Sequence, residues 1–306
     1  MQQLIEACIT EIQKALIGKE QQIRLSLCCL FSGGHLLIED LPGMGKTTFA
    51  HALAQVMGFS YSRVQFTSDL LPADILGVSV FEKKSGQFVF HQGPIFAQVV
   101  LADEINRATP KSQSALLEAM EERQVSIEGE TRQLPEPFFV IATQNPMSQA
   151  GTFPLPESQL DRFLMRISLG YPDPAAERDV LLGNSGRVQL SRVKNVIDAD
   201  QLKQIQQQVA DVKPAEAVLD YLQRLLTHTR QSEDFAYGLS PRAGLALLRC
   251  AQSWAYMAGR DYLIPEDVQM VLPAVVEHRL REHSDMQGRT GEALGQRLLQ
   301  AVPVVV

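Results

Sequence analysis

The chain has few cysteines, one tryptophan and no cysteine pair of the C-x-x-C type. Its 306 residues include four cysteines, which are Cys8, Cys28, Cys29 and Cys250. This usage argues against a disulfide framework and against a cysteine-rich metal site. We therefore expect four buried, free thiols in a reducing compartment.

Long apolar runs are also absent. No uncharged stretch approaches the roughly 20 apolar residues that a membrane-spanning helix needs. Residues 1–16 carry acidic groups early and lack the continuous apolar core of a secretory signal peptide. The sequence predicts a soluble, cytoplasmic protein without a membrane segment.

Basic charge is in short supply. The chain has 28 Lys and Arg residues against 35 Asp and Glu residues, which gives a formal net charge of −7. A protein whose main partner is nucleic acid normally carries a Lys/Arg-rich stripe, and none is visible here. The composition therefore argues against nucleic acid as the main partner, although a local basic loop could be hidden by the average. With 45% hydrophobic residues, the chain is long enough for one large or two modest domains.

The strongest positive signal is a glycine-rich segment that follows the apolar run 36–38. A short buried strand, a glycine-rich turn and a helix beginning with Lys-Thr form a phosphate-binding loop of the Walker A type. The two glycines let the backbone curl so that N–H groups point at phosphate oxygens, and the helix adds its partial positive charge. The residues expected to bind the nucleotide are Pro42, Gly43, Met44, Gly45, Lys46, Thr47 and Thr48.

Two side chains and one departure from the pattern define the chemistry expected of this loop. Lys46 is expected to reach the β- and γ-phosphates, and the Thr47 hydroxyl to bind Mg²⁺. The full pattern is G-x-x-x-x-G-K-[ST], and Asp40 stands in place of its first glycine. Because phosphate wrapping depends mainly on the later residues, we expect this substitution to be minor.

Polar side chains follow two further apolar runs. Asp103 and Glu104 come after residues 99–102, and Asn145 comes after residues 138–142. We expect Asp103 to hold the Mg²⁺ shell and Glu104 to polarise the attacking water. The Asn145 amide could orient the same water or contact the γ-phosphate. The alternatives are a solvated acidic strand end and, for an asparagine before proline, an ordinary turn.

Short apolar runs separated by helical segments predict an α/β fold with a parallel sheet covered by helices on both faces. Residues 1–30 read as two helices with a break near residues 17–20. The carboxyl ends of parallel strands are expected to form the site. The apolar runs are residues 36–38, 64–66, 99–102, 138–142 and 164–169.

Other segments depart from this alternation. Residues 78–90 and 124–134 have β-rich arms around glycine turns, which predicts two hairpins. From about residue 173 only helical patterns occur, and Ser240 followed by proline predicts a helix start. We therefore expect an α/β core over residues 1–172, a linker over 173–199 and an all-helical lid domain over 200–306.

In this order the segments resemble the MoxR family of AAA+ P-loop ATPases. The resemblance runs from about residue 10 to the C-terminal end, so it covers nearly the whole chain. A phosphate loop alone would be generic, whereas this ordered set is specific. The supporting stretches are residues 65–77, 103–108, 142–146 and 155–163.

The resemblance implies further roles. Asn145 matches sensor 1, and Arg162 matches the arginine finger that reaches the nucleotide of a neighbouring subunit. Arg242 matches sensor 2 on the lid, and Ile17 and Gly18 match the segment that packs on the adenine. A guanidinium fork suits the charge spread over the γ-phosphoryl oxygens, while a salt bridge to nearby acids is the alternative for Arg162. The hairpins match the helix-2 insert and the pre-sensor-1 hairpin.

Three functions compete. The resemblance implies an ATPase that uses ATP and Mg²⁺ to remodel or activate a partner protein, suspected to carry a von Willebrand factor A domain, within a nucleotide-dependent ring that is commonly a hexamer. A nucleic-acid translocase would need basic pore loops, yet residues 122–137 hold two arginines against four glutamates. A scaffold that binds ATP without turnover is disfavoured by the presence of Glu104, Asn145 and Arg162 together.

Overall fold

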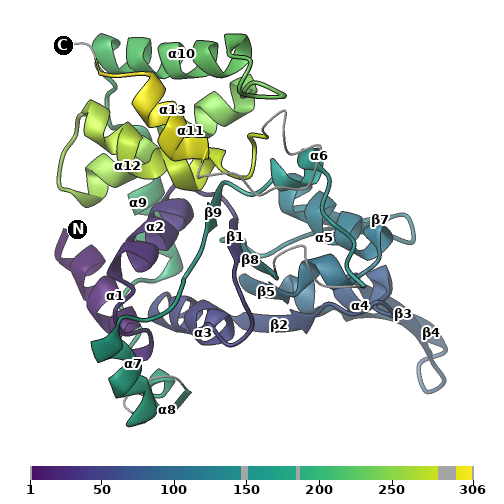
Figure 1. The fold of residues 1–306 in the computed structure, drawn as a ribbon. Coiled ribbons are helices and arrows are strands. Elements are labelled where there is room, and N and C mark those ends of the chain that lie inside the picture. Colours follow the sequence, from purple (N-terminus) through teal and green to yellow (C-terminus); the bar gives the residue numbers. More distant parts are fainter. Residues whose placement is uncertain (1, 146–150, 184–186, 282–293, 305–306) are drawn as a thin grey trace.

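The computed structural model describes residues 2–145, 151–183, 187–281 and 294–304. At its centre lies a five-stranded sheet in the order β2-β5-β8-β1-β9, and every neighbouring pair is parallel. The parallel sheet predicted from the apolar runs is confirmed (Figure 1). The strands are β1 Leu36–Glu39, β2 Tyr61–Gln65, β5 Val99–Asp103, β8 Phe139–Gln144 and β9 Met165–Ile167.

Successive residues of these strands point to opposite faces of the sheet, and each face carries its own apolar core. In β1, Leu36 and Ile38 join one core and Leu37 joins the other; in β5, Leu101 and Val100 divide in the same way. All five side chains are fully buried. A sheet buried on both faces explains why its strands read as continuous apolar runs.

Helices cover both faces, as predicted. Helices α1, α2 and α3 contribute to the larger core, and α4 and α5 contribute to the smaller one. The spacing of Ile5, Cys8, Ile9 and Ile12 places these apolar side chains on one buried face of α1. The bounds are α1 Gln2–Ala15, α2 Glu20–Phe31, α3 Lys46–Val56, α4 Pro72–Leu76 and α5 Pro110–Glu122.

Two antiparallel hairpins stand outside the sheet, and each overlaps a range in which the sequence predicts one. The β3–β4 hairpin extends from the core as an arm at the right of Figure 1. Gly93 closes its base, because an added Cβ there would lie 2.3 Å from the Ile75 carbonyl oxygen. The strands are β3 Gly77–Glu82, β4 Gln87–Gln92, β6 Gln124–Ile127 and β7 Glu130–Gln133. Short 3₁₀ turns, η1 Pro94–Phe96 and η2 Ile105–Arg107, flank β5.

The carboxyl-terminal part is helical, and its helices gather at the top of Figure 1. Ser240 caps α11 by accepting a hydrogen bond from the Ala243 N–H, with Pro241 at the first helical position as predicted. We call α9 to α13 the lid region. Their bounds are α9 Ala199–Ala210, α10 Glu216–Gln231, α11 Pro241–Met257, α12 Pro265–Val276 and α13 Leu294–Ala301.

Short helices join these parts. Helix α6, Glu157–Leu160, precedes β9. The segment expected as a linker, residues 173–199, contains α7, Pro174–Leu181, and α8, Arg187–Leu190. Asp173 caps α7 by accepting from the Ala176 N–H. This connection is therefore partly helical.

The lid region packs directly on α2. The Cys28 thiol donates to the Cys250 carbonyl oxygen at 3.2 Å, and the Ser253 hydroxyl donates to the Cys28 carbonyl at 3.1 Å. All four cysteines are buried and free, as expected. Burial raises the pKa of the Cys8 and Cys28 thiols to about 12, so they act as apolar packing groups. Within the described ranges, no helix is long and apolar enough to cross a membrane.

Candidate active site

The glycine-rich loop runs from β1 into α3, at the carboxyl edge of the sheet. Gly43 and Gly45 have φ angles of +85° and +86°, a left-handed conformation that favours glycine. Gly45 is the N-cap of α3 and Lys46 its first residue. A glycine-rich loop that leads into a helix amino terminus is a suitable anion site.

Lys46 is buried within this loop. Its Nζ donates to the Asp40 carbonyl oxygen at 2.7 Å and to Asn145 Oδ1 at 2.9 Å. Burial lowers the pKa of the ammonium group, and the carboxylates of Asp40, Asp103 and Glu104 act in the opposite direction. A phosphate group at the loop would supply the charge that this buried ammonium otherwise finds in nearby oxygens.

Asp103 ends β5 and lies beside the loop. Its Oδ2 accepts from the Thr47 hydroxyl at 3.4 Å and from Arg63 Nη2 at 2.6 Å, and its Oδ1 accepts from the Thr143 hydroxyl at 2.6 Å. The Thr47 hydroxyl and the Asp103 carboxylate are oxygen donors of the kind that Mg²⁺ prefers. These two residues therefore fit a magnesium ion, which would compete with Arg63 for Oδ2.

Glu104 is fixed from several sides. Its backbone is left-handed, with φ of +56°. Its Oε1 accepts from Asn145 Nδ2 at 3.0 Å, and its Oε2 accepts from Gln65 Nε2 at 3.0 Å and Arg107 Nη1 at 2.9 Å. Its backbone N–H donates to the Thr143 hydroxyl at 2.9 Å. An uncommon backbone conformation held by four contacts is typical of a functional position.

Asn145 joins two predicted site residues. Its amide oxygen accepts from Lys46, and its amide nitrogen donates to Glu104, so one side chain contacts both groups. Asn145 is also buried. The proline that follows it in the sequence, Pro146, lies outside the described residues. The structure thus brings Lys46, Asn145 and Glu104 into one chain of hydrogen bonds.

The segment before α2 packs beside the loop. Gly18 has φ of +72°, and an added Cβ there would lie 3.0 Å from the Ala176 Cβ and 3.2 Å from an Asp173 carboxylate oxygen. Leu16 reaches the loop itself, since a Cβ at Gly45 would lie 3.4 Å from its Cδ1. This segment therefore lies between the loop and the start of α7.

Arg162 and Arg242 lie near the amino ends of the sheet strands, opposite the carboxyl ends where the loop lies. Both donate to the carboxylate of Glu121, at 3.1 Å for Arg162 and 2.6 Å for Arg242. Glu121 follows Met120, whose carbonyl oxygen lies 3.2 Å from the imidazole of His35, immediately before β1. The loop follows the carboxyl end of β1, so these arginines and the loop are separated by the length of the strand.

The two arginines belong to a cationic pocket of about 400 Å³. Its lining includes five arginines and two acids, Arg123, Arg162, Arg242, Arg249, Arg279, Glu121 and Asp161. Asp161 accepts from Arg279 Nε at 2.7 Å. Arginine outnumbers acid here although the whole chain is acidic, so the pocket suits a phosphate or carboxylate ligand.

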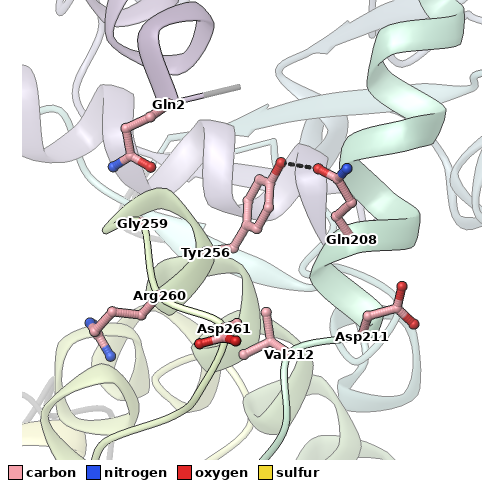
Figure 2. A pocket seen from close by; sticks show the side chains of 8 residues that line it. All are labelled: Gln2, Gln208, Asp211, Val212, Tyr256, Gly259, Arg260 and Asp261. Atoms are coloured by element: carbon pink, nitrogen blue, oxygen red, sulfur yellow. Dashed lines mark hydrogen bonds between the residues drawn. The ribbon is translucent and has the colours of Figure 1, made fainter.

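A second pocket of about 400 Å³ lies where the start of α1 meets the ends of α9 and α11 (Figure 2). The Tyr256 hydroxyl donates to Gln208 Oε1 across it, and Gln2 donates to the Met257 carbonyl oxygen at 2.8 Å. None of the predicted site residues lines this pocket. We assign it no part in the nucleotide chemistry.

Sequence reasoning missed several residues of the site. Arg63 contacts Asp103, Gln65 contacts Glu104, and Thr143 contacts both acids. Glu121 joins Arg162 and Arg242, which lie far from the loop. Gln65 lies in a stretch that carried the resemblance, but no role followed from it. These residues become visible only once strand order and helix ends are known.

Comparison with known proteins identifies both parts of the chain. Residues 35–165 match the family described as "ATPase family associated with various cellular activities (AAA)". Residues 227–298 match the AAA lid domain. The first match spans the phosphate loop, Asp103, Glu104 and Asn145, and the second includes Arg242.

Similar proteins cover nearly all of the chain. The chain is 42% identical over 305 residues to the uncharacterized protein YeaC of Bacillus subtilis (99% of this chain, 95% of that one), and 42% identical over 285 residues to Chaperone MoxR1 of Mycobacterium tuberculosis (90% and 75%). Protein MoxR of Methylorubrum extorquens is 31% identical over 294 residues, 88% of this chain and 85% of that one.

A solved structure agrees with this relationship. The crystal structure of a candidate ATPase from Cytophaga hutchinsonii superposes with a TM-score of 0.89 at 35% identity, covering 100% of this chain and 96% of that one. The two family matches, the relatives and the shared fold therefore show that this chain belongs to the MoxR family of AAA ATPases.

Proposed function

We propose that this AAA ATPase hydrolyses ATP with Mg²⁺ and uses the cycle to remodel, assemble or activate a partner protein. Family membership implies ATP binding and hydrolysis. The observation that carries the proposal is the hydrogen-bonded chain from Lys46 through Asn145 to Glu104. It connects the group expected at the γ-phosphate to the group expected at the attacking water.

Within one subunit, we assign the phosphates to residues 42–48 and the adenine to Ile17 and Gly18. Lys46 neutralises the β- and γ-phosphates, and Thr47 and Asp103 would hold Mg²⁺, which would supply further charge neutralisation there. Glu104 accepts a hydrogen bond from the attacking water and takes its proton. Asn145 aligns that water with the phosphate that Lys46 holds.

We assign Arg162 and Arg242 to the site of a neighbouring subunit. Their position at the amino edge of the sheet, beside Glu121, supports this role, because the phosphate loop of the same chain follows the opposite edge. A head-to-tail contact that brings one edge to the other repeats around a ring. AAA proteins are typically oligomeric, and we propose a hexamer that forms with nucleotide.

The β3–β4 hairpin supports a partner-binding role. Val80, Phe81 and Phe88 are 45%, 52% and 72% exposed, and the two phenylalanine rings pack edge to face at 5.3 Å. Clustered apolar side chains on an exposed arm are typical of a protein interaction site. We propose that this hairpin contacts the partner, and a von Willebrand factor A domain is the class suggested by the sequence resemblance.

A nucleic-acid translocase has less support. On the β6–β7 hairpin, Arg132 pairs with Glu130 and lies over the Phe90 ring at 4.0 Å, so its charge is already engaged. The chaperone-like reading agrees with the relative named Chaperone MoxR1. Binding of a nucleic-acid phosphate backbone would need unpaired cations along the β6–β7 hairpin.

The test is turnover of Mg²⁺-ATP by the purified chain, compared with Glu104→Gln. We expect Mg²⁺-dependent phosphate release by the wild type and a loss on the order of 10²- to 10⁴-fold in the variant, which retains ATP binding. Equal, negligible rates in both proteins under assembling conditions would favour a non-hydrolysing scaffold. Stimulation by single- or double-stranded DNA would favour the translocase.

A further inference from the structure

Asp40, which replaces the first glycine of the phosphate-loop pattern, has a fully engaged carboxylate. The residue is 8% exposed. Its Oδ1 accepts from the Leu41 N–H at 3.0 Å, and its Oδ2 accepts from the N–H groups of Leu169 and Gly170, both at 2.7 Å, and from the Ser168 hydroxyl at 3.2 Å. Charged acceptors of backbone N–H groups form strong hydrogen bonds. The loop is therefore tied to residues 168–170.

The backbone of Asp40 faces the nucleotide site. Its carbonyl oxygen accepts from Lys46 Nζ at 2.7 Å, and its N–H donates to the Gln144 carbonyl oxygen at 3.2 Å. Gln144 immediately precedes Asn145. A single residue thus contacts the lysine expected at the γ-phosphate, the end of β8 and the segment that follows β9.

Glycine is not required at this position for backbone reasons. Asp40 is not among the residues with a positive φ angle, whereas Gly43 and Gly45 are. A glycine here would gain no accessible conformation that the fold uses, and it would increase the freedom of the unfolded chain. The aspartate is therefore not a tolerated defect in the loop.

A second buried charge holds the same segment. We call residues 168–173, which run from β9 to α7, the connector. Lys19 is 8% exposed, and its Nζ donates to the Tyr171 carbonyl oxygen at 2.6 Å. Lys19 follows Gly18, which itself packs against Asp173. Both nucleotide-binding segments, the loop and the stretch before α2, thus attach to the connector.

The connector begins where β9 ends, and β9 is an edge strand of three residues. Arg162 lies three positions before Met165, the first residue of β9. Between them, the Leu164 N–H donates to the His35 carbonyl oxygen at 2.8 Å. Energetic coupling between separated sites can be carried by a rigid secondary-structure element that contacts both of them. Strand β9 therefore connects the side of the sheet that carries the phosphate loop, at the carboxyl ends of the strands, to the side that carries Arg162, at the amino ends.

We propose that Asp40 is a positioning residue that couples the phosphate loop to the connector and β9. Nucleotide binding at the loop of one subunit thereby orders the strand that leads to the Arg162 offered to its neighbour. The inference rests on the proposed assignment of residues 42–48 to the nucleotide. The attachment itself needs no second subunit and no hydrolysis.

Amide hydrogen exchange at Leu169 and Gly170, measured on the full chain with and without ADP, tests this coupling. In the wild type we expect ADP to slow exchange at both amides by about tenfold, the effect of one strong hydrogen bond becoming more persistent. In Asp40→Ala, which removes both acceptor oxygens, and in Asp40→Gly, which restores the usual glycine, we expect a change below about twofold.

Ser168→Ala is the matched control, because it removes only the longest of the four contacts and should retain the slowing. We also expect Asp40→Gly to raise the Kd for ADP several-fold, whereas a loop improved by the usual glycine would bind more tightly. Unchanged slowing in Asp40→Ala, or no slowing in the wild type, would overturn the inference. A wild type that does not bind ADP would instead contradict the proposed function. Loss of ADP binding in Lys46→Ala would show that ADP binds at the loop. A missing effect on Leu169 and Gly170 would then count against the coupling and not against the proposed function.

Discussion

Asn145 links two of the proposed catalytic groups, because its amide contacts both Lys46 and Glu104. We expect Asn145→Ala to lower kcat by about 100-fold, comparable to removal of one preorganised hydrogen-bond donor, with a much smaller change in the KM for ATP. Steady-state phosphate release over a range of ATP concentrations measures both parameters. An unchanged kcat would remove Asn145 from the catalytic arrangement.

His35 makes the stability of the fold sensitive to pH. Its Nδ1 accepts from the Val140 N–H at 3.0 Å, so its Nε2 donates to the Met120 carbonyl oxygen. Burial lowers the pKa of this imidazole from 6.5 to about 4, with the nearby Arg123 charge acting in the same direction. The neutral form is therefore required in the folded state.

The sign of the pH effect follows from proton uptake. Below pH 6.5 the unfolded chain protonates His35, whereas the folded chain does not until about pH 4. Stability from this group is complete above the unfolded pKa and is lost as pH falls toward the folded one, by about 3 kcal/mol in total. Urea unfolding at pH 7.5 and pH 5 should show about 2 kcal/mol of this loss, and the loss should shrink in His35→Gln. An equal loss in the variant would assign the effect to other groups, among them His278, whose pKa burial also lowers.

Single residues also show where the sequence was not enough. The meeting of Lys46, Asp103, Glu104 and Asn145 at one end of the sheet could be predicted, because each comes after an apolar run that forms a buried strand. The pattern predicts a minor effect of Asp40, since it records only that a glycine is missing. The carboxylate of Asp40 accepts four hydrogen bonds. One comes from the adjacent Leu41, and the other three come from residues 168–170, which are more than a hundred positions away in the chain.

Among the elements, α11 carries an exposed face that fits a contact between subunits. Arg242, Leu245 and Arg249 line the cationic pocket and recur at helical spacing on this face. Leu245 is 63% exposed. An exposed leucine between two arginines beside the proposed shared site suggests that this face is covered in the proposed ring.

We expect Leu245→Ser to weaken ATP-dependent self-association by about tenfold, because it removes one apolar contact from an interface, while leaving the fold of the single chain intact. Sedimentation velocity over a concentration series measures the association, and circular dichroism checks the fold. Leu219→Ser is the matched control, since Leu219 is 42% exposed but lies on α10. Equal association of both variants with the wild type would place the interface elsewhere.

Strand order explains which site residues could not be read from the sequence. The periodicity of apolar residues predicts that strands exist and that their carboxyl ends meet, but not which strands are neighbours. Because β2 lies beside β5, Arg63 and Gln65 reach Asp103 and Glu104. Because β8 lies on the other side of β5, Thr143 contacts Asp103 as well.

For the whole molecule, the decisive feature is that the phosphate loop and the arginine pair lie at opposite ends of the strands of one sheet. The role of Arg162 toward a neighbour was implied by the family resemblance, while the position of Arg242 beside it was not. Glu121 brings the two together from the core and the lid region. Residue types and spacing in the sequence carry no information on this long-range meeting.

The proposed sharing of a site between subunits would make activity depend on assembly. We expect phosphate release per subunit to rise with protein concentration and to level off once rings are complete, because ordinary mass action governs the contact. The Arg162→Ala variant should give a low rate that stays flat over the same series. A specific activity independent of concentration in the wild type, at concentrations where it is monomeric by sedimentation, would mean that one chain suffices.

In the proposed ring, each site combines the loop of one subunit with Arg162 of the next, and mixing two inactive variants tests this sharing. The Lys46→Ala subunit retains Arg162, and the Arg162→Ala subunit retains an intact loop. A site is therefore complete where the loop of an Arg162→Ala subunit meets Arg162 of a Lys46→Ala subunit. In a random equal mixture we expect phosphate release at about a quarter of the wild-type rate per subunit, since about a quarter of head-to-tail contacts are complete. A rate no higher than the sum of the two variants measured alone would contradict the shared site.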